Sequence, residues 1–97
     1  MTNGGLFRAG IDQVAASGPT LHIYEWRGSG PDYLHVHHAD DEAWHVLEGA
    51  LEFRIGPDTV TARLGDTVFV AAGTPHSYAS SPDGRYLIIL TPRLHAL

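Results

Sequence analysis

Apolar and polar residues alternate over short stretches of this chain, and turn-forming residues separate the stretches. Leu51, Phe53 and Ile55 alternate with Glu52 and Arg54, which is the period of two expected of a strand with one buried face. Short strands with frequent Gly- and Pro-containing turns are typical of an all-β sandwich or barrel. The pattern predicts strands near residues 20–26, 33–38, 43–47, 51–55, 59–64, 67–70, 76–79 and 85–90.

Two segments do not follow this simple alternation. Residues 87–90 are continuously apolar, which predicts a strand that is covered on both of its faces. Residues 11–16 precede Gly18 and Pro19, and we expect them to form one or two turns of helix that end there.

The size and composition of the chain limit the kinds of protein it can be. Its 97 residues fit one domain, 1–97, and its formal net charge of −5 without a basic stripe argues against nucleic-acid binding. Lysine and cysteine are both absent, which excludes Schiff-base, thiol, disulfide and cysteine-zinc chemistry. No apolar run approaches the ~18 residues of a membrane span, and no signal pattern opens the chain. We therefore expect a cytoplasmic protein that binds neither nucleic acid nor membranes.

Histidine is present in clear excess, with seven residues that form no continuous tract. His35 and His37 are separated by one residue, so both imidazoles project from the same face of the predicted strand. Glu42 follows across a short polar turn, and a buried carboxylate is costly unless it is paired with a cation. Imidazole is the commonest metal ligand in proteins. These three residues therefore predict a metal site.

His76 is the fourth candidate ligand, because it opens a predicted strand directly after the turn Gly73-Thr74-Pro75. Three neutral imidazoles and one carboxylate suit Fe, Mn, Co, Ni, Cu or Zn, and they are too rich in nitrogen for Ca or Mg. On an octahedral ion, four ligands leave positions open for water, substrate or dioxygen, as catalytic sites do. We predict one divalent transition-metal ion, whose identity the residues leave open.

These residues resemble the two sequence motifs of the cupin family. The first motif, over about residues 30–49, has its two histidines, its glutamate and its closing glycine at His35, His37, Glu42 and Gly49, and Gly30 lies one residue too close for its leading glycine. The second motif, over about residues 65–80, matches at Gly65, Gly73 and His76, with Ala71 for the usual proline and Ser80 for the usual asparagine. The resemblance implies a double-stranded β-helix, which is a jelly-roll barrel of two antiparallel sheets, with the metal in its wide end. It also implies a homodimer.

Residues an even number of positions apart along a strand have the same parity and point to the same face. This rule suggests roles for three aromatic residues near these ligands. Tyr78 shares the parity of His76, so its hydroxyl is a candidate catalytic acid or donor to a substrate, with packing as the alternative. Trp44 shares the parity of Glu42 and is either a core residue or a wall on which a substrate stacks. We favour core packing for Trp44 and for Phe53.

Other polar residues are expected to have no part in metal binding. His45 has the opposite strand parity to Glu42, so it points away from the metal, and His38 is expected in a surface turn. Asp40 and Asp41 are interpreted as a solvated acidic turn. Parity does not fix which way three further residues near the predicted barrel mouth point, namely His22, Tyr24 and Tyr33.

The predicted site supports several functions. The first is a metal-dependent enzyme that acts on a small organic molecule, dioxygenase-like by preference. The same metal, used as a Lewis acid, would instead give a redox-neutral isomerase, cyclase or lyase. In either case Glu42 is both a ligand and a candidate base, a role that the resemblance implies. A non-catalytic barrel that binds a sugar or another small molecule is the remaining alternative.

Overall fold

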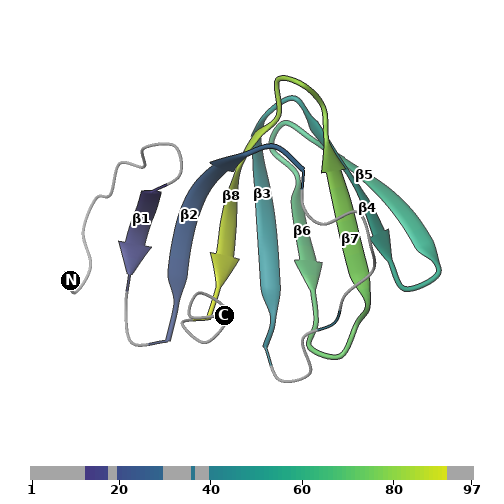
Figure 1. The fold of residues 1–97 in the computed structure, drawn as a ribbon, viewed down its shortest axis with the longest axis horizontal. Helices are drawn as coiled ribbons and strands as arrows, with labels where there is room; N and C mark the ends of the chain where they lie inside the picture. Colours follow the sequence, from purple (N-terminus) through teal and green to yellow (C-terminus); the bar gives the residue numbers. More distant parts are fainter. Residues whose placement is uncertain (1–12, 18–19, 30–35, 37–39, 92–97) are drawn as a thin grey trace.

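The computed structural model describes residues 13–17, 20–29, 36 and 40–91, and every regular element within these ranges is a β-strand (Figure 1). These ranges contain no helix that is long and apolar enough to cross a membrane. The strands are β1 (Gln13–Ser17), β2 (His22–Arg27), β3 (Glu42–Glu48), β4 (Ala50–Ile55), β5 (Asp58–Arg63), β6 (Thr67–Val70), β7 (His76–Ser80) and β8 (Arg85–Leu90).

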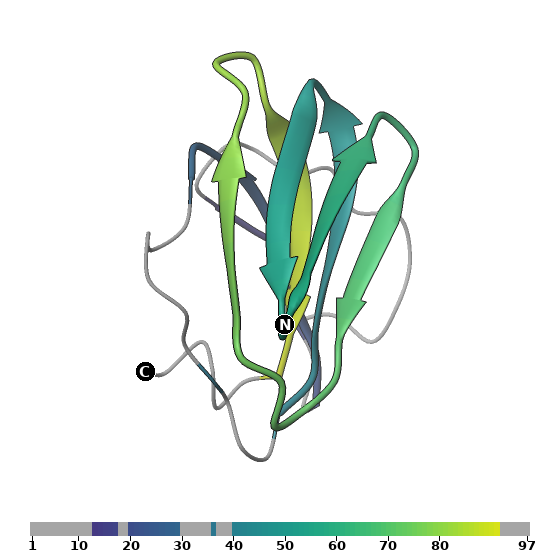
Figure 2. The ribbon, with the colours of Figure 1, turned by 90° about the vertical axis from the view of Figure 1, so that its right-hand side faces the viewer.

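The strands form two antiparallel sheets that lie against each other (Figure 2). The larger sheet has five strands in the order β1-β2-β8-β3-β6, and the smaller has three in the order β5-β4-β7. Strands that are distant in sequence are therefore neighbours, as β8 lies between β2 and β3. The predicted all-β fold of two antiparallel sheets is confirmed. The strand predicted at 33–38 lies outside the described residues, apart from Val36.

The helix predicted at residues 11–16 is wrong for the part that the structure describes. Residues Gln13–Ser17 form β1, which pairs antiparallel with β2, and the register shifts between Val14 and Ala16. Without β1, the backbone N–H and C=O groups along one side of β2 would have no strand partner. The ladder hydrogen bonds between β1 and β2 outweigh the weak helical preference of a short segment.

The core is made by the inward-facing residues of both sheets, because side chains alternate between the two faces of a strand. In β4, Leu51 and Phe53 are buried while Glu52 and Arg54 are exposed, as the sequence pattern predicted. Burial of one such large apolar side chain stabilises the fold by about 1.5–3 kcal/mol. The core consists of Trp44, Val46, Leu51, Phe53, Ala62, Val68, Val70 and Tyr86.

Residues 87–90 of β8 were predicted to be covered on both faces, and the structure corrects this. All four are half-buried, although β8 is an interior strand of the larger sheet. β2 and β3 flank these residues on either side within the sheet, so the neighbouring strands cover part of each side chain. On the inner face of β8, Tyr86 is fully buried, whereas Ile88 and Leu90 are less tightly covered than Trp44 of β3.

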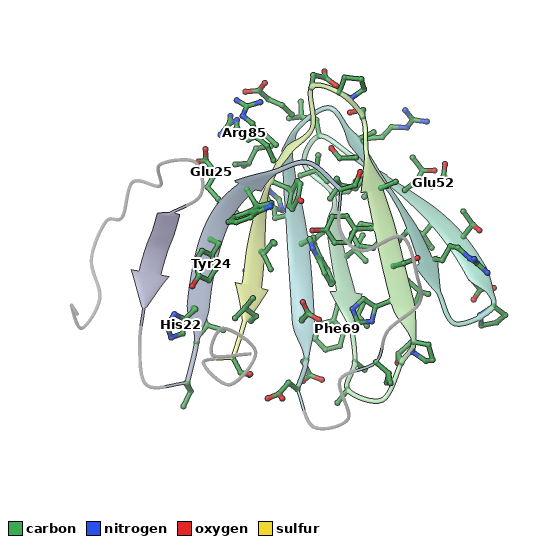
Figure 3. All side chains as sticks on the ribbon, viewed as in Figure 1. His22, Tyr24, Glu25, Glu52, Phe69 and Arg85 are labelled. Atoms are coloured by element: carbon green, nitrogen blue, oxygen red, sulfur yellow. The ribbon has the colours of Figure 1, made fainter. Side chains whose placement is uncertain are left out.

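An ion-pair cluster ties three strands together at the end of the barrel where β8 begins. Arg85 donates through Nε and Nη2 to Glu48 Oε1, each at 2.9 Å, and its Nη1 lies 3.3 Å from Glu25 Oε1. Figure 3 shows Arg85 and Glu25 at one end of the larger sheet and His22 toward the other. The first and last residues of β8 therefore belong to different ends of the barrel, and the polar site described below lies at the end of Leu90.

Gly49 is expected to tolerate substitution less well than Gly56. It joins β3 to β4 at a φ of 69°, and a Cβ built there would meet Asp83 Oδ1 at 2.7 Å and the Gly84 Cα at 2.9 Å. Gly56 also has a positive φ, of 55°, but a Cβ there would meet nothing within 4 Å.

Gly49→Ala should therefore lower the free energy of unfolding by more than Gly56→Ala. The control, Gly56→Ala, carries only the backbone strain of about 1–2 kcal/mol, whereas Gly49→Ala adds steric conflicts with the Gly84 Cα and with the side chains of Ser81 and Asp83. Urea unfolding of both variants measures the difference. Equal losses would show that the close approach at Gly49 relaxes without cost.

Candidate functional site

Glu42 and His76 meet at one end of the barrel, although they belong to different sheets. Glu42 is the first residue of β3 and His76 is the first residue of β7. The His76 Nε2 atom lies 3.2 Å from Glu42 Oε1, and the side chains are 1% and 11% exposed. Two of the four predicted metal ligands are thus brought into direct contact inside the protein.

The loops that precede these two strands are tied to each other by a hydrogen bond. Ala72 N donates to Asp41 Oδ1 at 2.8 Å, and Asp41 is the residue directly before Glu42. Thr91 Oγ1 donates to Asp40 Oδ1 at 2.7 Å. Asp41 is exposed and Asp40 half-exposed, as expected of a solvated turn, and in addition both carboxylates accept hydrogen bonds that fix the start of β3.

The turn before His76 is fixed by backbone hydrogen bonds. Thr74 N donates to Ala71 O at 3.2 Å, and Gly56 N donates to Pro75 O at 2.8 Å. The first bond closes the turn with alanine in place of the usual proline of the motif. The second bond anchors the turn to the connection between β4 and β5. His76 is therefore held at a defined position at the start of β7.

The imidazole of His76 is also fixed in its tautomer. His76 Nδ1 lies 2.9 Å from the carbonyl oxygen of Thr74. A carbonyl oxygen only accepts, so Nδ1 carries a hydrogen and donates it. In the neutral ring the lone pair of Nε2 then faces the carboxylate of Glu42, and two acceptors at 3.2 Å repel each other. A cation between them, either a proton on Nε2 or a metal ion, removes this repulsion.

The pKa of His76 reflects the same arrangement. Burial by itself lowers the pKa of the imidazole, because it disfavours the charged form. The hydrogen bond to Glu42, the hydrogen bond to the Thr74 carbonyl and the negative charge of Glu42 outweigh burial, so the pKa is raised above its ordinary value of 6.5. The surroundings of Nε2 therefore favour positive charge.

The other two predicted ligands, His35 and His37, lie outside the described residues. Within the ranges that are described, no group of three or more His, Cys, Asp and Glu side chains is placed to hold a metal. Glu42 and His76 are therefore the described half of the predicted four-ligand site.

Aromatic rings line the side of the site that faces the core. Trp44 packs edge-on against His76 with ring centroids 5.7 Å apart, and it also contacts Phe53 and Tyr78. Trp44 is 1% exposed, so of its two interpretations the structure supports core packing. Phe53 is fully buried and stacks on Tyr78 at 5.3 Å. These rings exclude water from one side of the Glu42–His76 pair.

Tyr78 lies between this aromatic cluster and Tyr86. The two hydroxyls are 2.9 Å apart, and the Tyr86 hydroxyl donates to the carbonyl oxygen of Gly28. Tyr78 therefore donates its own hydrogen to Tyr86. Burial raises the pKa of the Tyr78 phenol, and the charge of Glu42 adds to this increase. Tyr78 thus keeps its proton at neutral pH.

The strand register shows on which face of the sheet those side chains lie whose direction the sequence left open. His22 pairs with Leu90, and Leu90 pairs with Glu42, so these three side chains lie on the same inner face of the sheet. The same pairing places Tyr24 on the inner face. His45 lies on the outer face, where its Nδ1 is 2.8 Å from Thr67 Oγ1. His38 and Tyr33 lie outside the described residues.

Similarity to known proteins extends over most of the chain. The cupin domain family matches residues 21–91. An uncharacterised protein of Streptomyces coelicolor is 34% identical over 56 residues, which are 57% of this chain and 53% of that protein. The chain thus spans about half the length of this curated relative.

Solved structures share the fold at low sequence identity. KdgF from Halomonas sp. has a TM-score of 0.71 at 24% identity, covering 82% of this chain and 77% of that one. TT1209 from Thermus thermophilus has a TM-score of 0.65 at 23% identity, covering 80% and 77%. Pac13 of Streptomyces, described as a unique nucleoside dehydratase, has a TM-score of 0.67 at 15% identity, covering 81% and 66%. With the family match spanning most of its length and the two-sheet fold in place, this chain belongs to the cupin family.

Proposed function

We propose that this cupin is an enzyme that acts on a small organic molecule with a divalent transition-metal ion held by His35, His37, Glu42 and His76. The observation that carries the proposal is the approach of His76 Nε2 to Glu42 Oε1 at 3.2 Å, with the Nδ1 hydrogen donated to Thr74. Dioxygenase-like chemistry is the favoured activity.

The described half of the site fits a metal ion. A ligating histidine usually donates its other ring N–H to a carbonyl or carboxylate, as His76 does to Thr74. Ligand atoms at the usual 2.0–2.2 Å from one ion are about 3.0–3.4 Å apart, and the observed separation of 3.2 Å falls in this range. A nitrogen and oxygen donor set suits Fe, Mn, Co, Ni, Cu or Zn.

A bound ion would supply Lewis acidity and, if it is redox-active, a site for dioxygen beside the substrate. The residues of the chain supply the remaining requirements. Trp44 and Phe53 seal the core side of the site against water. The hydrogen bond from Ala72 to Asp41 fixes the loop before Glu42, and the Thr74 carbonyl fixes the ring of His76. The two side chains are therefore oriented before any ligand arrives.

A redox-neutral isomerase, cyclase or lyase is the second candidate, and Tyr78 favours it. The phenol is protonated at neutral pH, it lies within the field of the Glu42 carboxylate, and it shares the inner face with His76. An acid and a base on one face suit proton transfer to and from a substrate. The fold similarity to Pac13, described as a dehydratase, is consistent with this candidate.

The remaining features of the proposal come from the sequence and the family resemblance. The partner is a small molecule, and a non-catalytic binding role is the outcome if no turnover is found. A homodimer is proposed, and the 61% exposed Phe69 on the outer face of β6 offers apolar surface for a second copy (Figure 3). The cytoplasm is the proposed location.

Removal of either described ligand should lower metal content and metal-dependent stability together. At a free metal concentration about 100 times the Kd, binding stabilises the folded chain by about 2.7 kcal/mol, which raises Tm by about 10–20 °C in a domain of this size. We expect His76→Ala and Glu42→Gln to lose most of this rise, and elemental analysis to show the matching loss of metal.

His45→Ala is the control for this experiment, because His45 is a histidine on the outer face of the same strand as Glu42. It should keep the metal and the rise in Tm. Full metal occupancy in His76→Ala would contradict the four-ligand assignment.

Tyr78→Phe should separate the two proposed activities. An enzyme that uses the phenol as its acid loses about 10²–10⁴-fold in kcat, whereas a dioxygenase that needs Tyr78 only for packing changes little. The assay loads the protein with ferrous or manganous ion, screens small organic acids and diols, and records oxygen uptake beside product formation. Substrate-dependent oxygen uptake supports the dioxygenase, and turnover without oxygen supports the second candidate.

The metal-free protein should lose stability as the pH rises through the raised pKa of His76. In the unfolded chain the imidazole titrates near pH 6.5. Because the folded pKa is higher, the extra stability is fully present below about pH 6.5 and is lost above it. Thermal unfolding in chelator from pH 6 to 8.5 should show a steeper fall in Tm for the wild type than for Glu42→Gln. A shallower fall in the wild type would mean that Glu42 does not hold a proton on His76.

A further inference from the structure

Strand β5 forms an edge of the smaller sheet, and the proposed function uses none of its residues. Among the described strands β5 pairs only with β4, and Figure 1 shows the hairpin of these two strands on the right-hand side of the molecule. Resting on the homodimer proposed above, we propose that two copies of this chain pair antiparallel through β5, with the two-fold axis at Val60. The two smaller sheets then form one continuous sheet across the dimer.

The hydrogen bonds at the end of β5 show which backbone groups face its free edge. Arg63 N donates to Asp66 Oδ2 at 2.9 Å, and Asp66 N donates to Arg63 O at 2.8 Å, so both groups of Arg63 face away from β4. Its ladder partner Ala50 instead bonds to Ser81, the residue directly after β7, through N at 3.0 Å and through O at 2.9 Å. Arg63 and Ala50 are therefore a non-hydrogen-bonded pair of the ladder.

The same orientation recurs at every second residue of β5. Hydrogen-bonded and non-hydrogen-bonded pairs alternate in an antiparallel ladder, and β4 and β5 pair without a shift of register. Thr61 and Thr59 therefore turn their N–H and C=O groups to the free edge, as Arg63 does. Both threonines are exposed, and the described part of the chain offers these groups no hydrogen-bond partner. Such an edge is a template for another strand.

The free edge of β5 is complementary to itself. With the axis at Val60, Thr59 of each copy lies opposite Thr61 of the other, and each such pair exchanges two bonds, which gives about four main-chain hydrogen bonds. The same register places Arg63 opposite Pro57 of the other copy. The groups of Arg63 are already bonded and proline has no N–H, so the pairing ends there. A shift by two residues would place a threonine opposite one of these residues and lose bonds.

The exposure of Val60 supports a second copy as the occupant of this edge. Val60 pairs with the fully buried Phe53, so its side chain points inward, yet it is 40% exposed. The larger sheet therefore leaves this part of β5 uncovered. At the proposed axis the two Val60 side chains lie in a non-hydrogen-bonded pair, where facing side chains are closest. Their contact removes apolar surface from water.

The middle of β5 lacks the features that usually prevent edge strands from pairing. These features are lysine, proline, a bulge or a covering segment. Residues 58–63 contain neither lysine nor proline, their register with β4 is regular, and their charged side chains stand only at the two ends, at Asp58 and Arg63. Threonine and valine favour extended strands. The central residues are therefore suited to pairing with an identical strand.

The first test measures the Kd of the dimer by sedimentation equilibrium. Val60→Lys places two like charges directly opposite each other at the axis, and it should raise this Kd by at least about tenfold. Phe69→Lys is the matched control, because it makes the same change at an apolar residue of β6 that is 61% exposed. It should leave the Kd within about twofold of the wild-type value.

The second test removes one hydrogen-bond donor from the free edge. Thr61→Pro deletes an N–H that faces away from β4, so the ladder within the chain is kept, and the Kd should rise. Thr61→Ala keeps this N–H and should dimerise as the wild type does. If Thr61→Pro does not fold, hydrogen exchange of the wild type replaces it. The amides of Thr59 and Thr61 should then exchange more slowly as the protein concentration rises through the Kd.

The outcomes separate this interface from the metal site. Wild-type protein that stays monomeric at about 1 mM would overturn the pairing of two copies, as would amides of Thr59 and Thr61 that exchange at the same rate at all concentrations. A dimer weakened by Phe69→Lys but not by Val60→Lys would place the interface on β6 and overturn pairing through β5. Zinc binding is measured on the same samples, and a wild type that dimerises without binding zinc would overturn the proposed metal function alone.

Discussion

The site depends on the approach of two hydrogen-bond acceptors, the Nε2 of His76 and the carboxylate of Glu42, inside a protein that is largely sealed from water. Because Nδ1 of the same ring is committed to the Thr74 carbonyl, Nε2 has no hydrogen of its own in the neutral ring. Positive charge between the two groups makes the arrangement favourable. A proton on Nε2 would occupy the place of the proposed metal ion, so we expect protonation and metal binding to oppose each other at this point in the fold.

Much of this arrangement was predictable from the sequence, because its causes are local. The alternation in β4 identified Leu51 and Phe53 as core residues, since a strand exposes every second side chain to one face. The turn residues before His76 and the spacing from the histidine pair to Glu42 indicated two candidate ligands at strand starts. Two strands that begin at the same end of a barrel bring their first residues together, which is the contact that the structure contains.

The features that sequence reasoning missed depend on pairing between distant strands. Residues 13–17 are a strand because β2 offers them a hydrogen-bonding edge, and no local pattern carries that information. The direction of His22 and Tyr24 was open because both faces of β2 mix polar and apolar residues. Only the register with β8, which lies much later in the chain, assigns them to the inner face. Asp41 was likewise assigned to solvent because its acceptor role depends on the amide of Ala72.

The direction of the hydrogen bond between Tyr78 and Tyr86 affects whether Tyr78 can donate a proton to a substrate, and therefore bears on the choice between the two candidate activities. Tyr86 donates to the Gly28 carbonyl, so the proton of Tyr78 is directed toward Tyr86 and away from Glu42. For this phenol to act as an acid on a substrate, its hydrogen must first leave Tyr86 and rotate toward the ligand. The buried Tyr78–Tyr86 bond opposes that rotation, since breaking it leaves a buried acceptor without its donor. A chemistry that needs no proton from Tyr78 is therefore the less costly one for this site, which agrees with the preference for a dioxygenase-like activity already drawn from the sequence.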